Sequence, residues 1–272
     1  MAEPTTLAAL TIYRRMLGAR IRADWQFRTS FLLYLVGQTL VAGADFGAIA
    51  VIFSAVDDLA GWSAAEVACL YGISGLSFGL ADLFVSPVEW SARHIKQGTF
   101  DQFLIRPIGV LWQLLAMEFA ARRLGRSVQP MVVLVVSVTL LDVHWTPAAV
   151  ALVPLSVLCG AVIYSALWVV TSAMAFWTVE TQEMANALTY GGNLMTSYPI
   201  DVLGTWLRRF VTFVVPLASI AYLPTAWLVG KPLPFGLPGI AAWSGPLVAG
   251  AVALAARAVW GEAIRHYRST GS

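Results

Sequence analysis

The chain has 272 residues, of which 58% are apolar and only 12% are charged, and its formal net charge is +2. Soluble domains carry about 25% charged residues, and a soluble protein of this length could not bury so much apolar surface. We therefore expect an integral membrane protein, and the small net charge argues against a nucleic-acid-binding face. Long runs without charge, at 143–179 and 232–256, favour membrane helices over the alternating pattern of an outer-membrane barrel.

Residues 7–28 have the pattern of a basic amphipathic helix. A large apolar residue recurs every three or four positions, while Arg15 and Arg22 fall on the opposite face. Helices of this kind lie in the interface of a membrane instead of crossing it. We therefore expect an interfacial helix on the cytoplasmic surface, ahead of the first membrane span. Its apolar positions are Leu10, Tyr13, Leu17, Ile21 and Trp25.

The remaining apolar runs predict six membrane-spanning helices. A helix needs about 20 residues to cross about 30 Å of hydrocarbon, and residues 108–121, which are apolar but shorter, predict a further interfacial helix. We thus predict an all-α polytopic membrane protein with a single transmembrane domain over residues 1–272. The predicted spans are 30–53, 65–86, 127–145, 148–177, 208–229 and 239–260.

The positive charges orient these spans. Of the 17 Lys and Arg residues, five precede the first span, six lie between the second and third, and three close the chain: Arg257 near the end of the sixth span, and Arg265 and Arg268 after it. Arg208 and Arg209 open the fifth span, so that 16 positive charges fall on one side and only Lys231 falls on the other. The positive-inside rule makes the first of these sides cytoplasmic, and both termini are predicted to lie there.

Motifs of intrinsic catalysis are missing from the sequence. A nucleotide-binding P-loop needs G-x-x-x-x-G-K-[ST], and the Gly-Lys pair at Lys231 is followed by Pro232. No cluster of His, Cys and carboxylate residues has metal-site spacing, and no Ser/His/Asp set lies on one side of the membrane. Cys69 and Cys159 sit in apolar runs and are expected to be buried thiols. We therefore predict a chain that is not catalytic by itself and binds no cofactor.

Two acidic residues lie inside predicted spans. Asp45 falls in the middle of the first span, and Asp82 falls late in the second. Ionisable residues at membrane depth are costly, so each could line a substrate path or carry a proton, or could form a structural hydrogen bond between helices. Without a basic partner inside the membrane, the two acids would make a poor proton relay. The fifth span contains Pro216 and Pro224, which permit kinks.

Two long cytoplasmic loops are candidates for docking. Residues 87–107 mix charge with Trp90, Phe100 and Phe103, and a short charged helix with exposed aromatic side chains suits a groove on a partner. The alternative is a solvated loop that its aromatic residues anchor. The second loop, 178–207, is acidic and contains a Gly-Gly-Asn break. It is either another docking element or a pair of helix extensions below the membrane.

Three stretches carry a resemblance to a known family. Residues 98–107, Gly-Thr-Phe-Asp-Gln-Phe-Leu-Ile-Arg-Pro, resemble the G-x-[LF]-D-x-x-L-x-R-P loop of type-2 permease subunits of ATP-binding-cassette (ABC) exporters. A Tyr and Pro pattern over residues 198–230 is similar to the fifth helix of that family, and residues 260–269 are a weaker match. The likeness is to a bacterial six-span subfamily of multidrug and uncharacterised export permeases. The pattern over 198–230 consists of Tyr198-Pro199, Val215-Pro216, Tyr222-Leu223-Pro224-Thr225 and Gly230.

The resemblance implies a partner that hydrolyses ATP. Such permeases assemble with a second permease copy, or a related chain, and with two copies of an ATPase subunit that holds ATP and Mg. Residues 7–28 would be the elbow helix of the family, and the loop between the second and third spans would be its coupling helix. The residues expected to couple to the ATPase are Glu89, Trp90, Arg93, Lys96, Phe100, Asp101, Phe103 and Arg106.

The sequence as a whole suggests an exporter permease in the cytoplasmic membrane of a bacterium, in contact with lipid and not with nucleic acid. The few charges inside the spans favour a hydrophobic or amphiphilic cargo, and the two acids would favour a cationic one. The rival interpretations are a proton-coupled secondary transporter that uses Asp45 or Asp82, and a non-transporting membrane scaffold. A re-entrant hairpin at 230–245 stays open. The substrate path is expected at a dimer interface along the first, second and fifth spans, with Asp45, Asp82, Tyr198, Pro216 and Tyr222.

Overall fold

The computed structural model describes residues 18, 22, 28–106, 108–117, 121–178 and 182–267. This part of the chain is helical and contains no β-strand, which confirms the predicted all-α class. The predicted interfacial helix 7–28 lies outside the described residues, apart from residues 18, 22 and 28. Four described helices are long and apolar enough to cross a membrane, namely Leu32–Ala55, Ala64–Phe84, Pro147–Phe176 and Gly245–His266.

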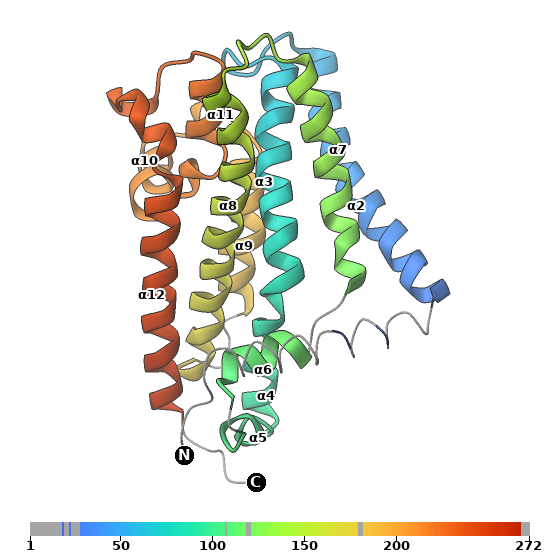
Figure 1. The fold of residues 1–272 in the computed structure, drawn as a ribbon, viewed down its shortest axis with the longest axis vertical. Helices are drawn as coiled ribbons and strands as arrows, with labels where there is room; N and C mark the ends of the chain where they lie inside the picture. The colour runs from blue at the N-terminus through green and yellow to red at the C-terminus, as the bar shows by residue number, and fades with distance from the viewer. Residues whose placement is uncertain are drawn as a thin grey trace.

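The helices form a bundle with two distinct ends (Figure 1). α2 (Arg28–Ala55) and α7 (Gly125–Leu140) run upward in this view, and α3 (Ala64–Phe84), α8 (Pro147–Ala173) and α12 (Gly245–His266) run downward. Short helices cover one end of the bundle, which we call the lower end, and the opposite one is the upper end. The lower-end elements are η1 (Ser86–Glu89), α4 (Trp90–Lys96), α5 (Asp101–Leu104) and α6 (Val110–Met117). We call the stretch that contains them, 86–117, the lower-end segment.

α3 is the central helix of the bundle, and it packs against α2, α7, α8 and α9. A capping box fixes its start: the backbone N–H of Glu66 donates to the Ser63 hydroxyl at 3.4 Å, and the backbone N–H of Ser63 donates to the Glu66 carboxylate at 2.7 Å. α8 begins in a similar way, because Thr146 accepts a hydrogen bond from Ala149 N–H and Pro147 occupies the first turn. Both helices therefore start where the sequence places capping residues.

Glycine residues bring α3 and α7 into close contact. A β-carbon on Gly72 would lie 2.7 Å from the Leu134 Cα atom, and one on Gly79 would lie 2.4 Å from the Ser127 hydroxyl oxygen. Small residues of this kind allow membrane helices to approach closely. The two helices cannot keep this separation if either glycine gains a side chain.

The third apolar helix is shorter than predicted. α7 ends at Leu140, whereas the sequence predicted a span over 127–145, and residues 141–146 are not helical. Leu141 has extended backbone (φ −72°, ψ 129°), which ends the helix before the next one starts. Sixteen helical residues rise about 24 Å, and the 3-10 turn η2 (Ala121–Leu124) extends this pass at the lower end.

The predicted span over 208–229 is wrong as a continuous helix, because the chain breaks at Val215 and Pro216. A proline has no N–H to donate, and it drives the preceding residue out of helical backbone. Val215 accordingly has φ −110° and ψ 93°. The pieces on either side of the break are α10 (Thr205–Arg209), the π-helical turn η5 (Phe210–Val214), the 3-10 turn η6 (Leu217–Ser219) and α11 (Tyr222–Leu228).

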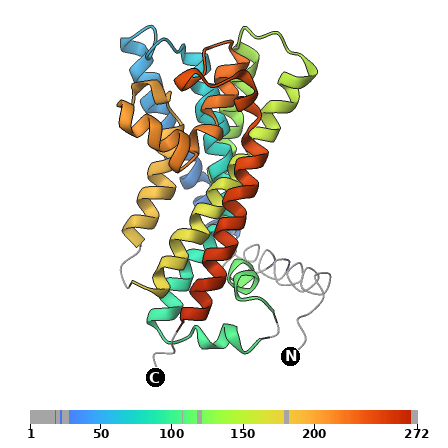
Figure 2. The same cartoon turned by 90° about the vertical axis from the view of Figure 1, so that its left-hand side faces the viewer.

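A helix occupies much of the region that the sequence predicted as a second cytoplasmic loop, 178–207. α9 (Gln182–Thr196) packs against α8 and α3 and rises from the lower part of the bundle (Figure 2). Residues 197–229, a series of short helical pieces that we call the irregular segment, follow it toward the upper end. The Gly-Gly-Asn sequence within it does not end the helix. A glycine destabilises a helix by about 1 kcal/mol. Gly192 lies against Leu217 of the irregular segment, where tertiary packing offsets this cost.

This arrangement places two positive charges at the upper end. The Arg208 guanidinium lies 2.7 Å from Asp201, and Asp201 also accepts a hydrogen bond from the indole of Trp62, just before α3 begins. Arg209 lies beside Arg208 in α10, with its Cζ atom 5.9 Å from the Phe235 ring centroid. The prediction that both arginines lie on the same side as the lower-end charges is therefore wrong. The reason is that α9 carries the chain from the lower end toward the upper end before residues 208 and 209 are reached.

Residues 230–245 form short turns instead of a helical hairpin. These are η7 (Pro234–Gly236) and η8 (Gly239–Trp243), both 3-10 helical. η8 packs on α11, and the rings of Trp243 and Trp227 meet edge to face with centroids 5.8 Å apart. This link closes the upper end before α12 descends (Figure 1).

Candidate functional site

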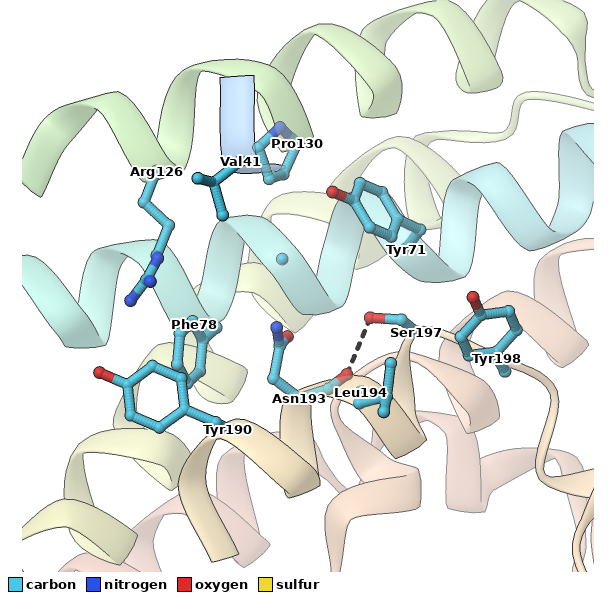
Figure 3. A pocket seen from close by; sticks show the side chains of 11 residues that line it. Val41, Tyr71, Phe78, Arg126, Pro130, Tyr190, Asn193, Leu194, Ser197 and Tyr198 are labelled. Carbon is cyan, nitrogen blue, oxygen red and sulfur yellow. Dashed lines mark hydrogen bonds between the residues drawn. The ribbon is translucent and has the colours of Figure 1, made fainter. Parts of the chain in front are cut away.

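A cavity of about 230 Å³ lies between α2, α3, α7 and α9 (Figure 3). Its lining is mainly aromatic and aliphatic, with several hydrogen-bonding groups and one positive charge. Concave sites with a few convergent polar groups are the usual places where small molecules bind. The lining residues are Val41, Tyr71, Gly75, Phe78, Arg126, Pro130, Tyr190, Asn193, Leu194, Ser197 and Tyr198.

Arg126 forms the charged end of the cavity. Its Cζ atom lies 5.3 Å from the Tyr190 ring centroid and 5.7 Å from that of Phe78. One guanidinium nitrogen lies 3.3 Å from a carboxylate oxygen of Asp82. A cation over an aromatic face is attracted by the ring quadrupole, by about 0.5–2 kcal/mol. The two rings and the carboxylate together hold Arg126 in place, and Figure 3 shows its side chain extending from α7 past Phe78 toward Tyr190.

Asp82 is a buried acid that two arginines share. Arg123 lies 2.9 Å from one carboxylate oxygen, Arg126 lies near the other, and Arg123 also donates to the Ser86 hydroxyl. A buried carboxylate is tolerated when it is paired and hydrogen-bonded in this way. The prediction that Asp82 has no basic partner is therefore wrong. Arg123 in η2 and Arg126 in the first turn of α7 lie beside the end of α3. The predicted third span started at 127 in order to keep these arginines out of the membrane.

A buried hydrogen-bonded cluster supports the cavity from α3, α8 and α9. The Ser74 hydroxyl donates to the side-chain amide oxygen (Oδ1) of Asn193 at 3.0 Å and shares a hydrogen bond with the Tyr164 hydroxyl at 3.1 Å. Tyr164 in turn shares a hydrogen bond of 2.6 Å with Thr196. Because buried polar groups need partners, this cluster fixes the Asn193 side chain at the edge of the cavity.

The five residues that the sequence predicted along a substrate path do not meet in one place. Tyr198 lines the cavity, and Asp82 contacts Arg126 at its charged end. Pro216 and Tyr222 belong to the irregular segment at the upper end. Asp45 belongs to α2, but its side chain lies outside the described part of the structure.

A second polar cluster attaches the irregular segment to the start of α3. Asp201 accepts hydrogen bonds from the Trp62 indole at 2.9 Å, from the Tyr222 hydroxyl at 2.6 Å and from Arg208 at 2.7 Å. Lys231 lies over the Trp62 ring, with its Nζ atom 5.1 Å from the centroid. The role of Tyr222 that the structure shows is thus an anchor at the upper end.

The lower-end segment buries two aromatic side chains that the sequence expected on its surface. Phe100 is 0% exposed and Phe103 is 4% exposed. The Phe100 ring packs edge-on against Phe176, with centroids 5.1 Å apart, and lies 4.8 Å from the Tyr267 ring. The expectation of exposed aromatics is therefore wrong for these two. Phe100 anchors the segment to the ends of α8 and α12, and Phe103 packs on Phe100, which favours the alternative interpretation of an anchored loop.

The outer surface of the same segment is basic and apolar. Arg93, Lys96 and Arg106 are exposed, and Ile105 is 76% exposed. Arg93 also lies over the ring of Trp90, with its Cζ atom 5.1 Å from the centroid. The predicted coupling residues thus divide into an outer set, which a partner can reach, and an inner set that packs.

Glu89 belongs to the inner set and connects η1 with α8. Its carboxylate accepts a hydrogen bond from the fully buried indole of Trp168. Burial raises the pKa of Glu89, because the charged carboxylate loses its hydration. Asp101, at the start of α5, is also partly buried. Neither acid projects fully from the lower surface.

Comparison with known families gives one match. The family model described as "ABC-2 family transporter protein" matches residues 39–271. The chain belongs to the ABC-2 transporter family. The match extends from the middle of α2 through α12, and it therefore includes the cavity and the lower-end segment. No curated protein and no solved structure matches the chain.

Membership of the ABC-2 family, together with its apolar helices, makes this chain a membrane protein. Chains of the family are components of transporters and are not catalytic themselves, and the family implies an ABC ATPase partner in general. Within the described residues, no group of three His, Cys, Asp or Glu side chains is placed to hold a metal ion.

Of the residues that line the cavity of this ABC-2 chain, sequence reasoning placed only Tyr198 on the substrate path. The missed ones include Arg126, which it grouped with the cytoplasmic charges, and Tyr190 and Asn193, which it assigned to a loop. A signal for the last two was present, because Tyr190, Asn193 and Ser197 recur every three or four residues, which is the spacing of one helix face. The adjacent glycines concealed it.

Proposed function

We propose that this chain is the membrane-embedded permease of an exporter that moves a hydrophobic or amphiphilic molecule outward. A separate ABC ATPase, which binds ATP and Mg, supplies the energy. The family match over residues 39–271 carries the proposal, because ABC-2 chains are transporter components that depend on such a partner. The cavity between α2, α3, α7 and α9 gives the transported molecule a place to bind.

The proposed topology has six crossings with both termini in the cytoplasm of a bacterium. α2, α3, α7 and α8 are the first four crossings, and α12 is the sixth. The fifth crossing combines α9 with the irregular segment above it. This version keeps the predicted number of crossings and replaces the predicted span over 208–229. The lower end would then face the cytoplasm, where residues 7–28 would form the elbow helix.

The proposed ATPase contact is the outer surface of the lower-end segment. Arg93, Lys96 and Arg106 offer positive charge there, and Ile105 offers an exposed apolar side chain. Its inner face is packed on the ends of α8 and α12, so that a push on the outer face would reach these helices directly. A complex would contain two ATPase copies and two permeases, either identical or related.

The surface of α2 supports a second permease as a partner. Only 6% of the residues in its most apolar stretch are buried within one copy. Large apolar residues such as Leu33 and Leu40, each 69% exposed, lie on this surface. In a membrane this surface contacts either lipid or another helix. The cavity opens beside it, at Val41, so that a second permease on α2 would complete the wall of the path.

A proton-coupled transporter receives less support. Its proton carriers would be Asp45 and Asp82, but Asp82 is engaged by two arginines, which favours a structural role. Transport that stops when the proton gradient is dissipated, while cellular ATP is maintained, would favour that rival over the ATP-driven exporter.

The experiment that tests the proposed function is co-expression with each ABC ATPase of the source organism, beginning with any that is encoded beside this chain. We expect the two to purify as one complex, and its ATP hydrolysis in lipid nanodiscs to change when the permease is present. The double variant Arg93→Glu and Lys96→Glu should release the ATPase. The matched control reverses two exposed charges at the upper end, Asp57→Lys and Asp142→Lys, and should keep the complex.

Failure of the complex to form with every ABC ATPase of the source organism would contradict the proposal. Binding without any effect of the permease on ATP hydrolysis, or on transport in cells, would instead favour a membrane scaffold.

A further inference from the structure

Two arginines contact a single carboxylate at the charged end of the cavity. Arg123 and Arg126 both contact Asp82, and among the described residues no other carboxylate lies within ion-pair distance of either guanidinium. Glu89 lies farther off, accepts its hydrogen bond from Trp168, and is partly buried, which raises its pKa and favours its uncharged form. Arg126, which lines the cavity, has the longer of the two contacts, 3.3 Å against 2.9 Å. A guanidinium has five N–H donors, so Arg126 can also bind an anionic group from the cavity side.

The remainder of the cavity suits a flat apolar body with hydrogen-bonding edges. Phe78 and Tyr190 flank Arg126, and Tyr71 stands toward the other end (Figure 3). The Asn193 carbonyl oxygen accepts from Ser74, so its amide NH₂ is the group that remains for a ligand. Rings at these positions can stack on an aromatic ligand and add to the area that it buries.

The rim of the cavity is apolar. Val41 on α2 and Leu194 on α9 both line the cavity and are 57% and 61% exposed. In a membrane these side chains face either hydrocarbon or an apolar helix of a second permease, so a molecule that enters between them must have an apolar part. Arg126 lies in the first turn of α7, at the lower end. A bound molecule would thus keep its polar group toward that end, in the orientation of a lipid in the leaflet there.

We infer that this cavity binds an anionic amphiphile, with its carboxylate, sulfonate or phosphate on Arg126 and its apolar body against the rings of Phe78, Tyr190 and Tyr71. That the amphiphile is the exported cargo rests on the proposed function. The inference reverses the cationic preference expected from the sequence, because both oxygens of Asp82 are occupied by arginines.

The test uses three probes that share one aromatic body and differ in charge. 2-Naphthaleneacetate is anionic, 2-(2-naphthyl)ethanol is neutral and 2-(2-naphthyl)ethylamine is cationic. Each is titrated against the purified full chain in phosphatidylcholine nanodiscs, with probe fluorescence and empty nanodiscs as the blank. We expect the anion to bind about tenfold or more tightly than the neutral probe, and the cation to bind weakest.

Two variants assign this preference to Arg126. Arg126→Gln should remove the advantage of the anion and leave binding of the neutral probe within about threefold. The matched control is Arg123→Gln, which removes the other partner of Asp82 but no cavity-lining charge, and it should keep the anion in first place. If Arg126→Gln does not fold, Tyr190→Ala provides a second readout, because it should weaken all three probes by a similar factor.

A further arm distinguishes two sources of the anion. The titration is repeated in nanodiscs that contain one quarter phosphatidylglycerol. If the natural occupant is an anionic lipid of the membrane, this lipid should compete with naphthaleneacetate and lower its apparent affinity. If the occupant is a separate molecule, the affinity should stay unchanged. Both outcomes keep the anion site. Equal affinity of the parent chain for the three probes, or a tighter cation, would overturn it. No ATPase is present, so failure of the proposed exporter would leave this result intact.

Discussion

At the start of the lower-end segment, Glu89 keeps a carboxylate beside the fully buried indole of Trp168. Burial raises its pKa, which means that the folded chain binds the proton more tightly than the unfolded chain does. Stability from this group is therefore greatest at or below the ordinary pKa of a glutamate. It decreases as the pH rises from that value through the raised pKa of the folded state.

Replacing Glu89 with glutamine should therefore flatten the pH dependence of stability. The amide would still accept the Trp168 hydrogen bond but carries no charge to desolvate. We expect the thermal midpoint of Glu89→Gln at pH 7.5 to equal or exceed that of the parent chain, and to change less between pH 5 and 7.5. Intrinsic fluorescence during heating in detergent measures both. Glu183→Gln, at an exposed position of α9, is the control and should keep the parental profile.

A second prediction at the residue scale concerns Gly72. Its β-carbon position lies 2.7 Å from the backbone of Leu134, so Gly72→Ala should force α3 and α7 apart and cost about 1–3 kcal/mol of stability. Gly37→Ala, in α2, meets no atom within 4 Å and should change the midpoint little. An equal effect of the two substitutions on the unfolding midpoint would show that the close contact between α3 and α7 does not contribute to stability.

At the scale of elements, the lower-end segment separates packing from recognition. Its inner face carries Phe100, which is enclosed by the ends of α8 and α12, and its outer face carries Ile105. The segment is too short to form a core of its own, so it depends on these aromatic contacts for its position. Its outer residues contribute little to that position.

The two faces should respond differently to truncation. Phe100→Ala should cost about 3–5 kcal/mol, because it removes a fully buried ring, and should lower the yield of folded protein. Ile105→Ala should leave the thermal midpoint within about 1 °C but weaken the complex with the ATPase. Size-exclusion profiles and co-purification measure the two effects. Loss of ATPase binding only in Phe100→Ala would move the recognition surface away from Ile105.

The sequence predicted those elements well whose local pattern and packing agree. The uninterrupted apolar runs of α3 and α8 located both helices to within a few residues. α9 was missed, because its adjacent glycines weaken the helix signal and its stability depends on packing against α8 and α3. Pro216 indicated a kink, but a local pattern cannot show that the chain stops crossing there. Asp82 found its arginines only through the relative depth of α3 and α7, which depends on tertiary structure.

At the scale of the whole molecule, the distribution of charge changes with the fifth crossing. The sequence placed Arg208 and Arg209 with the cytoplasmic charges, and the structure places them at the end opposite to η1 and α4. Asp201 shares that end and offsets one of the two charges. The positive-inside bias is therefore weaker than the linear sequence suggests, but the charges near α4 and the start of α7 remain together.

Cysteine labelling from the two sides of the membrane tests this topology. In a background with Cys69 and Cys159 replaced by Ser, we expect Arg209→Cys to react with an impermeant maleimide added outside intact cells. Asp58→Cys, at the upper end, should react likewise, and Lys96→Cys should react only after the cells are opened. Protection of residue 209 together with residue 96 would restore the original prediction of a span over 208–229.

The shared carboxylate of Asp82 and the glycine contacts between α3 and α7 have a mechanical consequence. Sliding one helix past the other by a turn would separate Asp82 from both arginines and break the close contacts at Gly72 and Gly79. We therefore expect α3 and α7 to move as one body in the proposed transport cycle. The hinge of that cycle then has to fall elsewhere, between this pair and the column formed by α9 and the irregular segment above it, and the cavity lies along that seam.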